Sequence, residues 1–317
     1  MIILIAFSVA LILSLLLLIK SADIFVDNLV EIGESLGVSH MILGVTASAI
    51  GTSLPEFGSA MIAILTGSSD IGVGVVIGSN IWNIAGILGI SAFVAGFIQT
   101  NRQELTRDGL MTLLTALILM AFMFLVDEIT AVVGIVLILV YVVYLWILIR
   151  SERKNNGNND KKVKKSKISR KSILMAVIGI TGLIIGARIL VYSGVEIARI
   201  ANIPEMLIGL FALAIGTSMP ELVVTLTSAM KRLHSLSFGT VLGSNVFNIM
   251  IGLGIPALFM NIHIEPLSVS FDAPAMIFVT ALLLLLAARK MKLTRFAGLA
   301  LMITYVIYIV TRILITI

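Results

Sequence analysis

Two glutamates lie inside long apolar stretches of the sequence, each directly after a proline. Glu56 follows Pro55, and Glu221 follows Pro220. A carboxylate near the centre of a bilayer costs several kcal/mol, about 2.5–3.5 on insertion scales, and is functional by default. The alternative is a paired or protonated glutamate that joins two helices. Neither apolar stretch contains a Lys or Arg that could form such a pair, which favours a functional role for both carboxylates.

The residues before each glutamate add neutral oxygen atoms. Proline removes a backbone donor and clashes with the preceding helical turn, which frees carbonyl groups near 49–53 and 214–218. Non-helical backbone at membrane depth is tolerated where it lines a cavity. Further oxygens come from the hydroxyls of Thr52, Ser53, Thr217 and Ser218. An all-oxygen set of this kind suits hard cations such as Ca²⁺ and Na⁺.

A second polar motif, GSN-x-x-N, occurs at 78–83 and again at 243–248. In its first copy Ser79 and Asn83 are four residues apart and share one helix face. Their counterparts in the second copy are Ser244 and Asn248. The middle asparagines, Asn80 and Asn245, point away from that face, so we expect a structural role for them.

The number of charges limits what such a site can hold. Two glutamates balance one Ca²⁺ in a dry site, or they hold several Na⁺ with help from neutral oxygens. Mutual exclusion between these two occupancies would produce exchange of one ion for the other.

The whole chain has the composition of an integral membrane protein. Of its 317 residues, 59% are hydrophobic and 12% are charged, and its mean hydropathy is +1.13. A soluble domain averages about 25% charged residues. These values exclude a disordered chain, a nucleic-acid-binding protein and an ordinary cytosolic enzyme. With no cysteine and three scattered histidines, a thiolate metal site or a zinc hydrolase is not expected, and we expect no cofactor.

Ten continuous apolar stretches are long enough to cross a bilayer as helices. They lie near residues 2–19, 41–66, 72–98, 109–126, 129–149, 172–192, 206–230, 237–260, 273–288 and 296–316. None shows the alternation of a membrane β-barrel. We expect the first to be a retained helix rather than a signal peptide, because no basic residue precedes it and no small-x-small cleavage site follows.

The distribution of basic residues predicts the orientation. If the loops between these spans alternate, 19 of the 22 Lys and Arg residues fall on one side. Basic residues concentrate in cytoplasmic loops, so we expect both termini of this multi-pass cell-membrane protein to be extracellular. The net charge of +5 then reflects topology rather than an acidic partner. The polar segment 151–171 is expected to be a flexible cytoplasmic linker, with binding of anionic lipid headgroups as the alternative.

This linker divides the chain into two halves, 1–150 and 172–317, that share sequence motifs. GTSLPE at 51–56 matches GTSMPE at 216–221, and the two GSN-x-x-N motifs are likewise 165 residues apart. Between positions 51 and 89, 14 of 39 residues are identical to their counterparts without a gap.

Five spans per half is an odd number, so the second half would enter the membrane inverted. We therefore predict an all-α integral membrane protein with ten transmembrane helices in two inverted five-helix repeats. Inverted repeats are typical of secondary transporters, whose substrate site lies near the midplane where the repeats meet. Two similar halves supply two near-equivalent states that expose one site to either side in turn.

The paired GTS-L/M-PE and GSN-x-x-N motifs resemble the alpha repeats of the calcium/cation antiporter superfamily. They most resemble its sodium/calcium exchanger branch, and the short ten-helix chain is similar to prokaryotic members. The resemblance is strong over 44–93 and 209–258 and topological elsewhere. It implies that spans 2, 3, 7 and 8 surround the ions, and that spans 1 and 6 slide across this core to alternate access.

The resemblance also implies roles for individual residues. Glu56 and Glu221 would bridge Ca²⁺ together with the backbone carbonyls of Thr52 and Thr217. Na⁺ would be held by the hydroxyls of Ser53, Ser79, Ser218 and Ser244 and by the carbonyls of Ala49 and Ala214. Asn83 and Asn248 would line the middle of the site. Na⁺ and Ca²⁺ would be the substrates of a monomer that needs no other partner.

Two departures from the family pattern bear on the coupling ion. Some prokaryotic exchangers and the potassium-dependent branch carry Asp where this chain has Asn248, so potassium co-transport is not expected. Proton-coupled relatives lack the Thr-Ser pair before the proline, so its presence at both sites favours Na⁺ over H⁺. The central linker is also too short for the calcium-sensing domain of eukaryotic exchangers.

Na⁺/Ca²⁺ antiport that exports Ca²⁺ from the cytoplasm is therefore the leading hypothesis. Ca²⁺/H⁺ antiport is the alternative within transport. A cation channel would have no use for the inverted repeat. A membrane-embedded hydrolase built on the two glutamates would lack a nucleophile and a histidine base.

Overall fold

The computed structural model describes residues 2–126, 128–158, 169–200 and 215–316, which are almost entirely helical. In the first half, the helices, π-helical segments (η) and strands are α1 (Ile2–Leu36), α2 (His40–Leu43), η1 (Gly44–Ser48), α3 (Ala49–Thr52), α4 (Leu54–Leu65), α5 (Ser69–Ile81), η2 (Trp82–Leu88), α6 (Gly89–Ala95), β1 (Phe97–Gln99), η3 (Glu104–Gly109), α7 (Leu110–Leu125), β2 (Glu128–Ile129) and α8 (Ala131–Asn158). In the second half they are α9 (Arg170–Ile200), α11 (Met219–Met230), α12 (His234–Met250), α13 (Gly254–Ala257), β3 (Ile262–His263), η4 (Ser268–Asp272), α14 (Ala273–Ala288), β4 (Lys292–Thr294) and α15 (Arg295–Thr316).

Most of the predicted spans have a helical counterpart. In the described residues, eight helices are long and apolar enough to cross a membrane, and the bent pair 40–52 and 54–65 is a ninth candidate. Of the remaining predicted span, 206–230, only residues from 215 onwards are described, and α11 forms its second half. The chain is thus an all-helical membrane protein with eight or nine candidate spans in its described part.

Three helices extend beyond their predicted ends, among them α9, which continues from the predicted end near residue 192 to Ile200. α1 continues from the predicted end near residue 19 to Leu36, because Ala22, Val26 and Leu29 repeat at helical spacing and are buried. α8 continues to Asn158, into the predicted linker 151–171.

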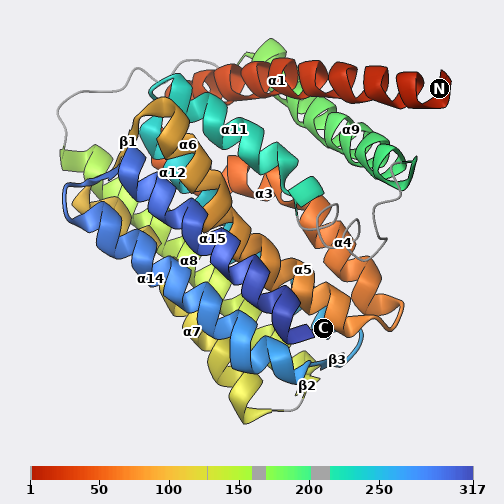
Figure 1. The fold of residues 1–317 in the computed structure, drawn as a ribbon. Helices are drawn as coiled ribbons and strands as arrows, with labels where there is room; N and C mark the ends of the chain where they lie inside the picture. The colour runs from red at the N-terminus through yellow and green to blue at the C-terminus, as the bar shows by residue number, and fades with distance from the viewer. Residues whose placement is uncertain (1, 127, 159–168, 201–214, 317) are drawn as a thin grey trace.

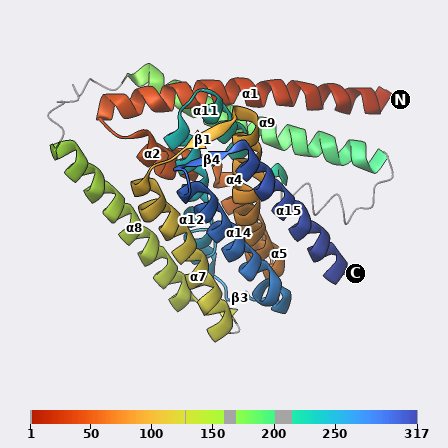
Figure 2. The same cartoon turned by 60° about the vertical axis from the view of Figure 1, so that its left-hand side comes forward.

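The helices form a bundle with two central members. In the segments Ser69–Ala95 and His234–Ala257, 83% and 94% of the most apolar window is buried, against 11–39% in the other candidate spans. Helices α7, α8, α14 and α15 lie around this centre (Figure 1). Helices α1 and α9 lie against each other and cross the other helices obliquely (Figures 1 and 2).

The buried apolar side chains form two separate clusters. The larger cluster includes residues of both central helices, such as Ile84 and Val246, and of the helices around them. The smaller cluster joins α1 and α9, through side chains such as Phe25 and Leu183, to Val224 of α11. The α1–α9 pair therefore packs on α2, α11 and α12 through a cluster that is distinct from the larger one.

Two short β pairs connect the halves. Strand β1 pairs antiparallel with β4, with Phe97 opposite Thr294. Strand β2 pairs antiparallel with β3, with Glu128 opposite His263. Each pair takes one strand from each half. In both pairs, a strand that follows a central helix (β1 or β3) joins a strand that precedes the last helix of the other half (β4 or β2).

Glycines allow the bent segment to approach α12 closely. A Cβ atom at Gly243 would lie 2.5 Å from the Val45 carbonyl oxygen, and one at Gly44 would lie 2.6 Å from that of Leu236. Small residues at helix contacts are a common means of close packing in membranes. Here they bring η1 and α3 directly against α12.

The Gly243 contact gives a test of this packing. Gly243→Ala should lower the stability of the protein by about 1–3 kcal/mol, because backbone atoms cannot move aside as side chains do. Gly58→Ala is the matched control, since a Cβ atom there meets no described atom within 4 Å. Thermal unfolding in detergent should show a lower midpoint for Gly243→Ala only. Equal midpoints for the two variants would contradict the close approach.

Candidate functional site

Each predicted glutamate stands at the start of a helix that begins in the middle of the bundle. α3 ends at Thr52 and α4 begins at Leu54, with Ser53 between them and Pro55 in the first turn. The helical segment His40–Thr52, which ends with α3, and the segment Leu54–Leu65 are bent by 47° relative to each other. α11 begins at Met219 in the same manner, preceded by Ser218 and with Pro220 in its first turn. The prolines thus place two helix N-termini inside the protein.

The carboxylates lie in the first turns of these helices and are buried. Glu56 is 1% exposed and Glu221 is 0% exposed. The positive end of the helix dipole partly offsets a negative charge at this position. Within the described residues, no Lys, Arg or His side chain forms an ion pair with either glutamate.

Hydrogen bonds cross between the halves at this point. The Ser218 hydroxyl donates to Glu56 Oε1 over 2.6 Å, and the Ser53 hydroxyl donates to Glu221 Oε1 over 2.8 Å. Each serine precedes one glutamate in sequence but contacts the glutamate of the other half. The two GTS-x-PE motifs therefore form one site rather than two.

The second motif lies on the two central helices. Ser79 is on α5, Asn83 is on η2, and Asn248 is on α12, all of them buried. Asn248 Nδ2 lies 3.4 Å from Ser79 Oγ, and α11 packs against both η2 and α12. A π-helical segment such as η2 is common at functional sites.

The middle asparagines connect these helices to each other. Asn83 Nδ2 donates to Asn245 Oδ1 over 3.0 Å, and Asn245 Nδ2 donates to the Asn80 carbonyl over 2.9 Å. Asn80 Nδ2 donates to the Val76 carbonyl. Asn245 thereby fixes the orientation of Asn83. This is a structural role, as expected for Asn245, although the particular contact with Asn83 depends on how α12 packs against η2.

Several buried oxygens of the site have no partner within hydrogen-bond distance among the described groups. They are Glu56 Oε2, Glu221 Oε2, Asn83 Oδ1, Asn248 Oδ1 and Ser244 Oγ. Buried polar atoms without a partner are rare in folded proteins, so each needs an explanation such as an ion. Two of the five belong to carboxylates and three are neutral oxygens, a donor set that a hard cation prefers. Other buried polar atoms without a partner among the described groups, such as Ser91 Oγ and Tyr141 Oη, lie outside these motifs.

The remaining candidates are placed as follows. Ala49 and Thr52 are buried in α3, and the Thr52 hydroxyl donates to the Ser48 carbonyl over 3.0 Å. Thr217 lies in the turn that precedes α11. Ala214 lies outside the described residues.

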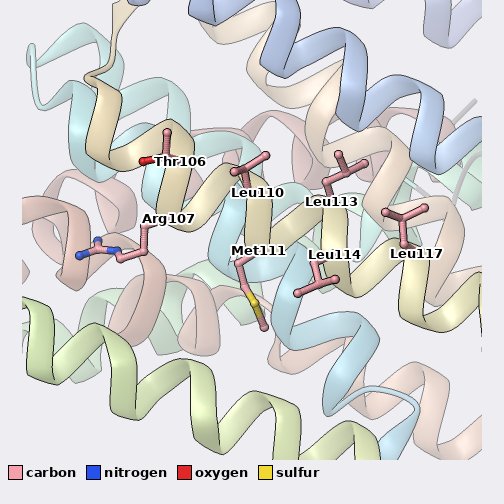
Figure 3. A pocket seen from close by; sticks show the side chains of 7 residues that line it. All are labelled: Thr106, Arg107, Leu110, Met111, Leu113, Leu114 and Leu117. Carbon is pink, nitrogen blue, oxygen red and sulfur yellow. The ribbon is translucent and has the colours of Figure 1, made fainter.

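A pocket on α7 does not belong to this site. The residues that line it lie at the start of α7 and on η3, and five of the seven are Leu or Met (Figure 3). They are Thr106, Arg107, Leu110, Met111, Leu113, Leu114 and Leu117. The pocket contains none of the predicted site residues.

Comparison with known proteins connects this geometry to a family. The model of a family described as sodium/calcium exchanger protein matches residues 7–150 and 171–314, which together make up most of the chain. The chain belongs to the sodium/calcium exchanger family.

Individual relatives of this exchanger cover nearly its whole length. It is 32% identical to the sodium/calcium exchanger MaX1 of Methanosarcina acetivorans over 95% of this chain and 96% of that protein. It is 32% identical to an uncharacterized membrane protein of Methanocaldococcus jannaschii, over 94% and 95% of the two chains. Its fold matches a solved structure of the sodium-calcium exchanger NCX_Mj, soaked with Na⁺ and Sr²⁺, with a TM-score of 0.83, 31% identity and coverage of 98% and 99%.

The family confirms the class of protein that the motifs predicted. The chain is a multi-pass membrane protein of a secondary-transporter family whose members exchange cations for Ca²⁺. The motifs were sufficient for this prediction, because Pro, Glu, Ser and Asn recur together at a fixed offset within apolar stretches of the sequence.

Asn248 offers a test of the site that does not remove a carboxylate. Asn248→Asp should make exchange depend on pH in a new way, because the variant resembles the parent when the new carboxyl is protonated. The two should diverge as pH rises and the carboxylate forms. Gln99→Glu adds a carboxyl group at an exposed position and is the control. Identical pH profiles of ion flux for Asn248→Asp and the parent would contradict the location of Asn248 at the ions.

Proposed function

We propose that this protein is a secondary active antiporter that exchanges Na⁺ for Ca²⁺ across the cell membrane. The observation that carries the proposal is the pair of buried carboxylates, Glu56 and Glu221, which come from opposite halves and have no cationic partner among the described residues. A cation that binds between them would neutralise both. The named exchangers among its relatives support Na⁺ and Ca²⁺ as the ions.

In this proposal, both carboxylates and the carbonyls of Thr52 and Thr217 hold Ca²⁺. Na⁺ uses the same carboxylates together with neutral oxygens. These come from Ser53, Ser79, Ser218 and Ser244 and from the carbonyls of Ala49 and Ala214, with Asn83 and Asn248 in the middle of the site. Because the ions share the carboxylates, Na⁺ and Ca²⁺ exclude each other.

Alternating access follows from the two halves if they form inverted five-helix repeats within ten spans. Support comes from the crossed serine–glutamate hydrogen bonds and from the two β pairs, each of which takes one strand from each half. The α1–α9 pair would slide across the core, and its separate apolar cluster is compatible with such a shear motion. The basic linker would then be cytoplasmic, both termini extracellular, and Ca²⁺ would leave the cell.

Ca²⁺/H⁺ antiport is the second candidate. The unpartnered Oε2 atoms of both glutamates could accept protons in place of Na⁺. The Thr-Ser pair before each proline favours Na⁺, because it adds neutral oxygens that a proton does not need.

Flux through purified protein in liposomes tests the proposal. An outward Na⁺ gradient should drive ⁴⁵Ca²⁺ uptake that saturates with Ca²⁺, and no uptake should occur without the gradient. Ca²⁺ flux driven by a pH gradient in the absence of Na⁺ would instead decide for proton coupling. Flux that needs no counter-ion would indicate a channel.

Removal of one charge tests the site itself. Glu56→Gln or Glu221→Gln should abolish Ca²⁺ transport, because one carboxylate leaves the divalent charge unbalanced. The fold should persist, since the amide oxygen can still accept the bond from Ser218 or Ser53. Glu128→Gln, at an exposed position, is the control and should transport normally. Transport that survives in either site variant would overturn the assignment.

A further inference from the structure

We infer that a column of buried hydroxyls, all but one of them in the second half, is the route by which cations pass between the carboxylates and one face of the membrane. The hydroxyl column consists of Ser48, Thr225, Ser228, Ser237 and Thr240, and each of these residues is 0% exposed. The inference rests on the proposed ion exchange at Glu56 and Glu221.

The column begins at the carboxylate of α11. Thr225 follows Glu221 by four residues and Ser228 follows by seven, so all three share one face of the helix. From Glu221 they lead along α11 towards its end at Met230.

The facing helix α12 continues the column. The Ser237 hydroxyl donates to the Thr225 carbonyl over 3.0 Å, which places the start of α12 beside the middle of α11. Thr240, one turn later, donates to the Ser48 hydroxyl of η1 over 2.8 Å. Ser244 follows on the same face, and its Oγ is among the unpartnered oxygens of the site. The hydroxyls on α12 therefore also lead to the ions.

Two hydroxyls of the column have no hydrogen-bond partner among the described groups. These are Thr225 Oγ1 and Ser228 Oγ. Buried threonines elsewhere satisfy their hydroxyls within their own helix, as Thr115 does with the Thr112 carbonyl and Thr280 with that of Met276. The hydroxyls of Thr225 and Ser228 do not form this bond, although both side chains are fully buried. Their oxygens are thus available to a hard cation, or to the water it carries.

A cluster of charged side chains lies at the end of the column. The turn between α11 and α12 contains Lys231, whose ammonium lies 3.0 Å from Asp23 and 2.7 Å from Asp27 of α1. Partial burial alone would lower the pKa of Lys231, but its hydrogen bonds to both aspartates outweigh this and raise the pKa. Arg232 follows Lys231 in the same turn, so the two basic residues of the turn balance the two aspartates of α1.

The first half has no equivalent column. The positions 165 residues earlier on α4 and α5 are Ala60, Ala63, Gly72 and Val75, none of which has a hydroxyl. In an inverted pair of repeats these positions lead to the opposite face. Cations that leave through the α11–α12 face, which is predicted to be cytoplasmic, would therefore meet hydroxyl oxygens. Cations that leave along α4 and α5 towards the opposite face would meet apolar side chains.

The double variant Thr225→Val/Ser228→Ala tests this inference. Both changes keep most of the side-chain volume and remove the hydroxyl. In membrane vesicles of both orientations, the Ca²⁺ concentration that gives half-maximal Na⁺-dependent flux should rise about tenfold at the α11–α12 face. It should stay within about twofold at the other face, and equilibrium ⁴⁵Ca²⁺ binding to the solubilised protein should stay unchanged.

The controls separate the column from the site and from folding. Thr227→Val removes a hydroxyl from α11 on a different, half-buried face and should have no effect. Thr225→Ser keeps a hydroxyl at this position and should transport like the parent. If the double variant folds poorly, the single variant Ser228→Ala takes its place, with a smaller expected effect. Equal changes at both faces, or flux equal to that of the parent, would overturn the inference. If the unmodified protein itself fails to exchange Na⁺ for Ca²⁺, the proposed function has failed instead.

Discussion

The site is arranged around two buried carboxylates in the centre of a membrane protein. Neither has a cationic side chain beside it among the described residues. Neither Glu56 nor Glu221 has an ion-pair partner among the described residues, and each has an oxygen without a hydrogen bond. Such groups are costly in a bilayer. The structure reduces the cost with one helix N-terminus and one serine hydroxyl for each carboxylate. In the proposed function, a bound cation offsets the remainder. An ion that completes the site can also leave it, which a transporter requires.

The helix breaks make this arrangement possible. Pro55 and Pro220 start α4 and α11 inside the protein, and the serines at the breaks reach across to the other half. Gly243 and Gly44 bring the broken segment against α12. The GTS-x-PE motif therefore combines a break, a dipole, a hydroxyl and a charge within six residues. The close approach of the halves makes each copy depend on the other.

Much of this could be predicted from the sequence, because the signals are local. The apolar runs predicted the helices, and the proline before each glutamate predicted the break between α3 and α4 and the start of α11. The contact between Asn245 and Asn83 could not be predicted, since it depends on the register between α12 and η2. The extension of α1 to Leu36 does not follow from hydropathy, because charged residues such as Lys20, Asp23 and Asp27 interrupt the apolar stretch after residue 19. Thr225 and Ser228 resembled ordinary small helix residues until their hydroxyls proved to have no partner among the described groups.

Anomalous scattering from crystals soaked with Sr²⁺, as a heavy analogue of Ca²⁺, tests the central claim most directly. The account predicts one strong peak between the carboxylates of Glu56 and Glu221, within coordination distance of both. Transfer of the same crystals to high Na⁺ should remove the peak, because the two ions share these oxygens. A principal peak elsewhere in the protein, or one that persists at high Na⁺, would contradict the account.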